Sequence, residues 1–357
     1  MIVKKKNIIN LFLLILSLSV VFLSIEIYLK TFYPQNLSGS WRIRNENGLI
    51  TNKNSGEAKH FWKNSEELGE GGRGEELYAK YSFGKYNNRI YKNLLVDQSN
   101  EKILILGDSY TFGWLLNDED TFVYQLQKKF INKFFVNSAS GGWGTADHLK
   151  YIQLYCKKIN PKEVWIFFNN ADISRSISSN LYKIDYYGNL IELNPRISIQ
   201  QRIKLFINSF YLYHWLLENS HSVQLIRNSF IKIPDHNITF NKIKKSSNES
   251  NYFVKKLFIE LKKESELCKA NLKIFYLGWP IDKEHLNNET KSFINLTNKE
   301  KFFIKHDIKF YNLMYSKHMI NVKNNVNYYR LKEGHPNKYG NTNIFLSVVD
   351  VLKYINL

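Results

Sequence analysis

The stretch Lys102–Trp114, KILILGDSYTFGW, constrains the fold of this chain more than any other. Its first five residues, through Leu106, are mostly leucine or isoleucine, which is typical of a short buried strand, and Gly107 ends the run. Asp108 and Ser109 then form a tight turn at the carboxyl end of that strand. In an open α/β sheet, ligands and catalytic groups gather at this edge. Gly-Asp-Ser is also an ordinary turn sequence, so its meaning depends on what the rest of the chain places beside it.

Further strand-like segments alternate with helix-like segments along the chain. Phe134–Asn137 and Glu163–Phe168 each follow an amphipathic stretch, and each runs into a polar or glycine-rich loop. This alternation predicts a parallel sheet whose loops converge at one edge. After an interruption the pattern returns, with a helix over Tyr252–Ala270, strands over Leu272–Leu277, Ile308–Leu313 and Val326–Leu331, and a final helix over about Thr342–Ile355.

The charge and the cysteine content narrow the function classes. The net charge is +18, but the lysines are scattered along the chain and no nucleic-acid-binding motif is present, so we expect no nucleic-acid partner. The two cysteines, Cys156 and Cys268, lie in helix-like segments and are expected to be buried small hydrophobic residues, with a disulfide as the alternative in an oxidising compartment. No Cys-His cluster has metal-ligand spacing, and we expect no metal and no cofactor.

The N-terminus predicts a membrane anchor over residues 1–30. Three lysines precede an apolar run from Ile8 to Ile25, and 18 residues are just enough to span a bilayer as a helix. No small-x-small cleavage site follows, which favours an uncleaved anchor over a signal peptide. The positive charge before the span predicts a cytoplasmic N-terminus and an extracytoplasmic remainder.

The rest of the chain divides into two parts. Residues 31–100 are polar and predict a stalk and irregular lead-in without chemistry, held to the domain surface by aromatic residues such as Trp41. Residues 101–357 predict the functional domain, with an insertion at about 173–250. The insertion begins with a hairpin around Tyr187-Gly188-Asn189 and continues through an aromatic-rich, helix-like stretch. It either covers the site or packs on the flank of the domain, and its aromatic side chains either pack in a core or stack on sugars.

A histidine follows the last predicted strand. His335 lies between Gly334 and Pro336, with Glu333 two positions before it. A single loop histidine is commonly a surface residue. In a catalytic triad, however, a carboxylate holds the imidazole through Nδ1 while Nε2 faces the nucleophile, and Glu333 is placed for that role. The alternative for Glu333 is a solvated surface charge.

Three motifs in order resemble the SGNH (GDSL-type) hydrolases: Gly107-Asp-Ser-Tyr-Thr-Phe-Gly113, Asn137-Ser-Ala-Ser-Gly-Gly-Trp-Gly-Thr145 and His335-Pro-Asn-x-x-Gly340. The resemblance covers about Lys102 to the C-terminus, apart from the insertion, and the anchor is similar to that of membrane-anchored bacterial members. It implies a flavodoxin-like three-layer α/β/α sandwich with a parallel sheet, and serine chemistry on esters. Ser109 would be the nucleophile and His335 the general base.

The resemblance also implies an oxyanion hole built from the Ser109 N–H, a backbone N–H of the second motif and an asparagine side chain after the third strand. Ala139 stands where the family has glycine in the second motif, with Gly142 as the alternative donor. After the third strand an ungapped count selects Asp172, but an anion is a poor donor, so Asn170 is preferred, with Asn169 as the alternative.

These features favour an extracytoplasmic serine esterase that removes acyl groups from a cell-envelope glycan. A second hypothesis is an O-acyltransferase that passes the acyl group from Ser109 to a sugar hydroxyl, supplied by a membrane acyltransferase partner. A third is a non-catalytic scaffold of an envelope assembly that retains the fold, which the altered sequence after the third strand supports.

Overall fold

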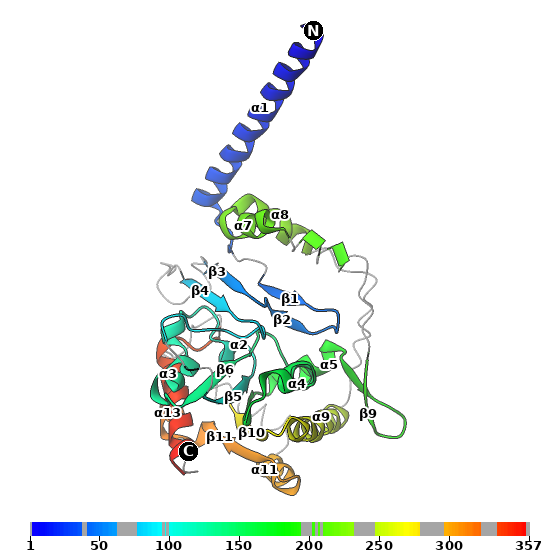
Figure 1. Cartoon of the computed structure of the whole chain (residues 1–357), viewed down its shortest axis with the longest axis vertical. Helices are drawn as coiled ribbons and strands as arrows, with labels where there is room; N and C mark the ends of the chain where they lie inside the picture. The colour runs from blue at the N-terminus through cyan, green and yellow to red at the C-terminus, as the bar shows by residue number, and fades with distance from the viewer. Residues whose placement is uncertain are drawn as a thin grey trace.

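A long N-terminal helix, α1 (Ile2–Phe32), stands away from the folded part of the chain (Figure 1). The structure, a computed structural model, describes residues 2–37, 41–62, 77–94, 97, 100–193, 202–203, 206–207, 210–231, 247–278, 296–322 and 334–354. Within α1, Asn7–Phe32 is long and apolar enough to cross a membrane, and residues 7–25 are exposed. The predicted apolar helix is therefore present.

A five-stranded parallel sheet forms the centre of the domain. Its strands lie in the order β11-β10-β7-β5-β6, which in chain order is the 2-1-3-4-5 arrangement of flavodoxin-like folds. Their bounds are β5 (Glu101–Leu106), β6 (Lys133–Asn137), β7 (Glu163–Phe168), β10 (Asn271–Tyr276) and β11 (Lys309–Asn312). The predicted fold is confirmed. The segment expected as a strand at Val326–Leu331 lies outside the described residues.

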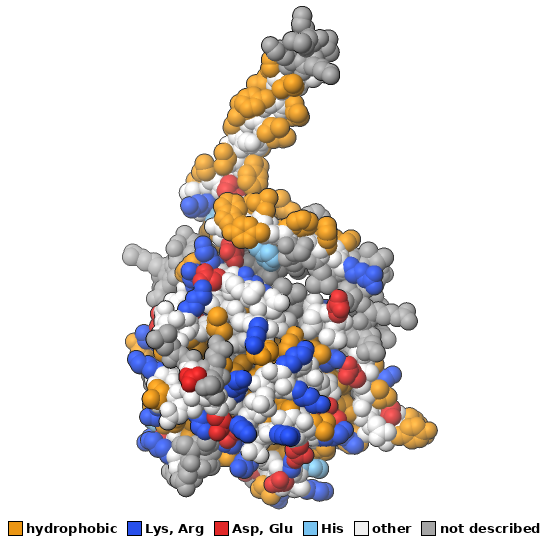
Figure 2. Space-filling view, in the orientation of Figure 1, with side chains coloured by type: hydrophobic (Ala, Val, Ile, Leu, Met, Phe, Trp, Pro, Cys, Tyr) orange, Lys and Arg blue, Asp and Glu red, His pale blue; other side chains and the backbone are white. Residues whose placement is uncertain are grey.

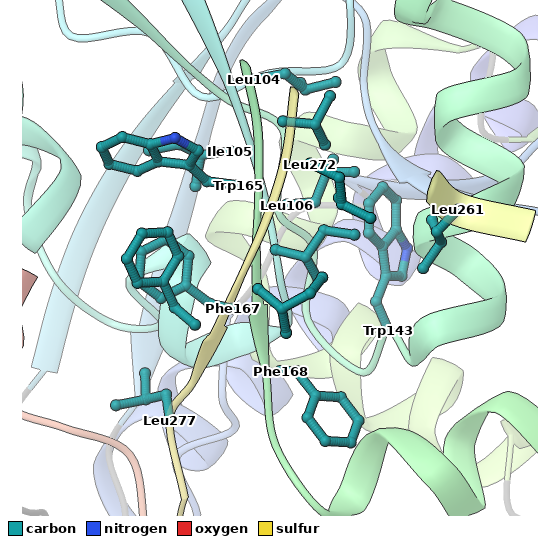
Figure 3. Packing of buried hydrophobic residues seen from close by; sticks show 14 of the residues in the cluster. Leu104, Ile105, Leu106, Trp143, Trp165, Phe167, Phe168, Leu261, Leu272 and Leu277 are labelled. Carbon is teal, nitrogen blue, oxygen red and sulfur yellow. The ribbon is translucent and has the colours of Figure 1, made fainter. Parts of the chain in front are cut away.

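Helices cover both faces of this sheet, because its strands are apolar on both sides. Figure 3 shows Trp165 and Phe167 on one side of the sheet and Leu104, Leu106 and Phe168 on the other. One layer contains α3 (Phe122–Lys129) and α13 (Lys338–Tyr354), and the other contains α4 (Thr145–Ile159), α5 (Ala171–Ser179) and α9 (Ser247–Leu267). Shorter elements complete the domain: α2 (Ser109–Phe112), α11 (Leu296–Lys305) and α12 (Lys317–Val322), with 3-10 turns at Asp118–Asp120 and Leu313–Tyr315.

The segment expected to be an irregular lead-in is folded. It forms two antiparallel pairs, β1 (Arg42–Arg44) with β2 (Ile50–Asn52) and β3 (Gly56–Trp62) with β4 (Leu77–Phe83). Single bridges through Arg89 join β4 to β6 at the edge of the central sheet. Four of its aromatic side chains, Trp41, Tyr81, Phe83 and Tyr91, are buried and do more than hold a stalk to the surface.

The insertion contains the predicted hairpin, β8 (Tyr182–Ile184) with β9 (Leu190–Glu192), whose turn uses Gly188 at a φ of +81°. Two helices follow, α7 (Tyr211–Asn219) and α8 (His221–Ile231). They lie where α1 meets the domain: α8 contacts α1, and α7 contacts β3 (Figure 1).

The two cysteines form a disulfide. Cys156 in α4 and Cys268 after α9 have Cα atoms 6.0 Å apart and are bonded. The expectation of two unpaired cysteines was wrong, because the sequence does not reveal that α4 and α9 pack side by side. A bond that closes a loop of 112 residues stabilises the fold by about 4–5 kcal/mol in the chain-entropy account.

Candidate active site

Ser109 is the first residue of α2 and directly follows the turn that ends β5. The Asp108 side chain caps this short helix by accepting a hydrogen bond from the Tyr110 N–H at 2.9 Å. Gly107 is required there, because a Cβ at this position would lie 2.1 Å from Thr111 Oγ1. The turn therefore delivers the serine to the carboxyl edge of the sheet, as predicted from the motif.

His335 meets Ser109 across 226 residues of sequence: its Nε2 lies 2.8 Å from Ser109 Oγ. The loop that carries it is held by Tyr110, whose hydroxyl donates to the Gly334 carbonyl at 2.5 Å. The Trp114 ring stacks on the imidazole with 5.9 Å between centroids. A neutral imidazole in this position accepts the serine proton. Glu333, predicted to orient His335, lies outside the described residues, and its role stays a prediction.

A charged network lies on the other side of the Ser109 turn. Asp108 Oδ2 accepts from Asn169 Nδ2 at 2.7 Å and from Arg175 Nη1 at 2.6 Å. Arg175 Nη1 also lies 3.5 Å from Asp172 Oδ1. Burial, together with the Asp108 charge, raises the pKa of Asp172 well above its usual value. Sequence reasoning missed Arg175; the available signal was its position one helical turn after Asp172, on the helix that follows β7.

Of the two asparagines after β7, the structure brings Asn169 to the Ser109 turn. Asn169 is buried, and its side chain also accepts a hydrogen bond from the Ala171 N–H at 2.9 Å. Asn170 is partly exposed at the N-terminal end of α5. The preference for Asn170 as oxyanion donor therefore has no support from this arrangement, because α5 begins where Asn169 faces inward.

The second motif also differs from expectation. The Ala139 N–H donates to Asn137 Oδ1 at 3.3 Å, and its methyl group is buried among aromatic rings, so this N–H is not turned toward Ser109. Gly141 lies beside the nucleophile instead: a Cβ on Gly141 would be 3.7 Å from Ser109 Cβ. Gly142 follows with a φ of +79°, a conformation that favours glycine. Gly141 therefore makes the contact with Ser109, and Gly142, the alternative donor, is the next residue in the same turn.

Residues of the lead-in segment pack against the site and bind its backbone. Trp41 stacks on Phe112 with 5.1 Å between centroids and contacts Trp114 at 5.6 Å. The buried Arg89 guanidinium donates to the carbonyl oxygens of Phe112 and Gly113 at 2.9 and 3.0 Å. Residues that the sequence analysis assigned no chemistry therefore position α2 and the ring that packs on His335.

The Ser109 edge is distinct from a cavity of about 650 Å³ between α9 and α11. That cavity is lined mainly by lysines and asparagines of the two helices, and none of its lining residues belongs to the site. The cavity is therefore separate from Ser109 and His335.

No family model and no curated protein matches the sequence. Among solved structures, it is similar to the psychrotrophic esterase EstA from Pseudoalteromonas sp., at 14% identity over 72% of this chain and 100% of that one, with a TM-score of 0.43. It is also similar to a lipolytic protein of the G-D-S-L family from Veillonella parvula (13% identity, 71% and 98% covered, TM-score 0.41). A GDSL-like lipase from Bacteroides thetaiotaomicron is similar at 10% identity, with 71% and 89% covered and a TM-score of 0.38.

With TM-scores below 0.5, these likenesses carry no argument about activity or substrate. The fold follows from this chain's own strand order and from where its motifs lie. The Gly-Asp-Ser turn, the second glycine-rich loop and the His335 loop meet at the carboxyl edge of a 2-1-3-4-5 parallel sheet. The chain therefore has a flavodoxin-like α/β fold, and the arrangement of its motifs fits the SGNH (GDSL-type) form of that fold.

Proposed function

We propose that this protein is a serine hydrolase of the SGNH type that acts on ester bonds. The observation that carries the proposal is the 2.8 Å contact between Ser109 Oγ and His335 Nε2 at the carboxyl edge of the sheet. Covalent acyl transfer requires a nucleophile and a base within hydrogen-bond reach of each other. The same contact argues against the third hypothesis, a non-catalytic scaffold.

The reaction proceeds in two halves. Ser109 Oγ attacks the acyl carbonyl carbon while His335 Nε2 takes the serine proton. The tetrahedral intermediate collapses, the bond to the alcohol oxygen breaks, and His335 returns its proton to that oxygen. Water then attacks the acyl-serine, with His335 again as base, and releases the carboxylic acid and free Ser109.

The negative charge of the intermediate needs hydrogen-bond donors. The Ser109 N–H is at the start of α2, where a helix leaves its first N–H groups without intrahelical acceptors. The Gly142 N–H, in the turn beside Ser109, is the second donor we propose. The loss of one such donor costs on the order of 100–1000-fold in rate.

The substrate we propose is an acylated cell-envelope glycan outside the cytoplasm. An apolar helix that can span a membrane precedes the domain, and the domain contains a disulfide. Disulfides persist in oxidising, extracytoplasmic compartments. Together these features support a single-pass protein with a cytoplasmic N-terminus and an extracytoplasmic domain.

An O-acyltransferase is the second candidate, because the sheet edge that carries α2 is on the side of the domain nearer to α1 (Figure 1). A membrane partner that supplies acyl groups would meet Ser109 on that side. The acyl-serine is the same in both reactions; only the acceptor, water or a sugar hydroxyl, differs.

The first test uses the full-length chain in detergent with a fluorophosphonate probe and p-nitrophenyl acetate. We expect the wild type to label and turn over, and Ser109→Ala and His335→Ala to lose activity by at least about 1000-fold, because the covalent route then closes. Gln125→Ala, a partly buried position on α3, is the control and should retain activity. A folded wild type that neither labels nor turns over contradicts the hydrolase.

Hydrolase and transferase are separated by the acceptor. With an acetyl donor and an added oligosaccharide, free acetate as the main product supports the hydrolase. Acetylated sugar in excess over acetate supports the transferase.

A further inference from the structure

The two helices α7 and α8 present an apolar face to the outside of the molecule. Tyr211, Leu212 and Trp215 of α7 are 50–83% exposed, and Leu225 and Ile226 of α8 are 38% and 55% exposed. Spacings of three and four residues place the α7 set on one face of its helix, and Leu225 and Ile226 are adjacent residues of α8. Figure 2 shows hydrophobic side chains gathered over α7 and α8, beside the domain end of α1. Patches of this kind on a protein surface mark an interaction site.

The opposite face of the pair is packed and polar. Leu217 is fully buried, and Gln224 Nε2 donates to its carbonyl at 2.6 Å, which joins the two helices. Glu218 Oε1 accepts from the Lys59 N–H of β3 at 3.3 Å, which joins α7 to the lead-in sheet. The pair is therefore amphipathic, and its apolar side is the one turned away from the domain.

A single carboxylate of α1 holds the start of α8. Glu26 accepts hydrogen bonds from the backbone N–H groups of His221 and Ser222, at 2.6 and 2.9 Å, and from the hydroxyl groups of Ser220 and Ser222, at 2.9 and 2.6 Å. The Gln35 N–H, just after α1, donates to His221 Nδ1 at 2.9 Å. The position of α8 along the axis of α1 is thereby fixed.

The place of Glu26 on α1 then gives the depth of the pair in a membrane. The apolar run from Ile8 to Ile25 is 18 residues, or about 27 Å of helix, close to the roughly 30 Å thickness of a hydrocarbon core. With that run across the core, Glu26 lies at the outer boundary, and so does the start of α8. Tyr and Trp side chains are enriched at this depth.

We propose that the outer face of α7 and α8 lies in the outer membrane–water interface, with its apolar side chains among the lipids. Helices that bind membranes in this way bury one face at the boundary between headgroups and acyl chains. With α1 as the first membrane attachment, α7 and α8 form a second one and fix the orientation of the domain on the bilayer. The proposal rests on α1 spanning the membrane, and it does not depend on the esterase activity.

The test places a nitroxide label on single added cysteines at Leu212 and Ile226 of the full-length chain in phosphatidylcholine–phosphatidylglycerol nanodiscs. Accessibility to oxygen, which concentrates in lipid, is compared with accessibility to a water-soluble nickel chelate. Leu16, in the middle of α1, is the lipid reference. Ile304 of α11, an apolar side chain 76% exposed at the opposite end of the domain, is the water reference. Circular dichroism checks that each labelled protein is folded.

For each label we compare the ratio of its accessibility to oxygen to its accessibility to the nickel chelate. We expect this ratio to be at least about fivefold higher at Leu212 and Ile226 than at Ile304. Labels as accessible to the chelate as at Ile304 would overturn the docking. Labels shielded from both reagents would also overturn it, because a protein partner or a second copy would then cover the face. A Leu16 label exposed to the chelate would show that α1 does not span, and the proposal would fail at that step.

Discussion

The two sides of Ser109 are built from different chemistry. On the aromatic side, which consists of Trp41, Phe112 and Trp114, the rings pack on one another and Trp114 stacks on the His335 imidazole. On the charged side, which consists of Asp108, Asn169, Asp172 and Arg175, two buried carboxylates share one guanidinium. The nucleophile is positioned between a packed surface and an ion network.

This difference predicts which substitutions destabilise each side. When a packed ring is truncated, the protein loses folding free energy in proportion to the volume removed. A ring of similar shape can replace another at small cost. A buried charge network responds to the loss of one partner, because the remaining charge stays desolvated. Substitutions of similar size should therefore cost more on the charged side.

The largest effect on stability is expected for Arg175→Leu. It removes the guanidinium that pairs with the carboxyl groups of Asp108 and Asp172, which are 2% and 0% exposed. We expect a loss of about 3–5 kcal/mol in the free energy of unfolding. Urea unfolding followed by circular dichroism of the full-length chain in detergent measures it.

The matched control is Lys80→Leu, which removes the same charge from an exposed pair with Glu57 and should cost at most about 1 kcal/mol. Adding Asp108→Asn to Arg175→Leu should recover part of the loss, because one uncompensated carboxylate is then gone. Equal costs for Arg175→Leu and Lys80→Leu would show that the network is not desolvated.

On the aromatic side we expect Trp41→Leu to cost about 2–3 kcal/mol, since a large side chain that is 3% exposed is replaced by a smaller one. Trp114 then loses one of the rings that support it, Trp41 and His60. We expect kcat for p-nitrophenyl acetate to fall more than KM rises, because His335 is less well oriented. Steady-state kinetics beside urea unfolding measures both.

Tyr186→Leu, at a 97% exposed position in the hairpin turn, is the control and should change stability by less than about 0.5 kcal/mol. Trp41→Phe, which keeps a ring on Phe112, should retain most of the kcat. If Trp41→Leu lowers stability but leaves kcat unchanged, the aromatic side supports the fold alone and does not orient His335.

The central sheet and the Ser109–His335 pair were predictable because their signals are local. β7 has the predicted bounds, Glu163–Phe168, since an apolar run flanked by a proline and by polar residues is unambiguous over six residues. The Gly-Asp-Ser turn after β5 lies at the carboxyl edge of the parallel sheet, where such a turn is expected. The Gly-His-Pro loop reaches the same edge directly before α13 and brings His335 to Ser109, and the strand predicted ahead of it lies outside the described residues.

The other parts of the site depend on packing that sequence patterns do not contain. β1 and β2 have three residues each, too few for a periodic signal, and the burial of Trp41 comes from α2, about 70 residues later in the chain. Asn169 and Asn170 are chemically identical neighbours, and only the residue at which α5 begins decides which one faces inward. The Cys156–Cys268 bond likewise follows from the packing of α4 on α9.

The smallest expected effect concerns His148, a fully buried residue of α4 near the charged side. Burial lowers the pKa of His148 from 6.5 to about 4, although the Asp108 charge and the Gly107 backbone favour the protonated form. Between these values the unfolded chain binds a proton that the folded chain does not, so stability falls as pH decreases. This group alone should cost about 2 kcal/mol between pH 7 and pH 5.

Asp147, on the same helix, acts in the opposite direction, because burial raises its pKa to about 6 and the folded state gains a proton first as pH falls. His148→Leu separates the two, since Asp147 titrates in both proteins. In thermal melts, the Tm of the variant minus the Tm of the wild type should be several degrees larger at pH 5 than at pH 7. A difference in Tm that is the same at both pH values would mean that His148 is already solvated in the folded state. The charged side would then be open to water at its base, and the cost assigned to Arg175→Leu would have to be lowered with it.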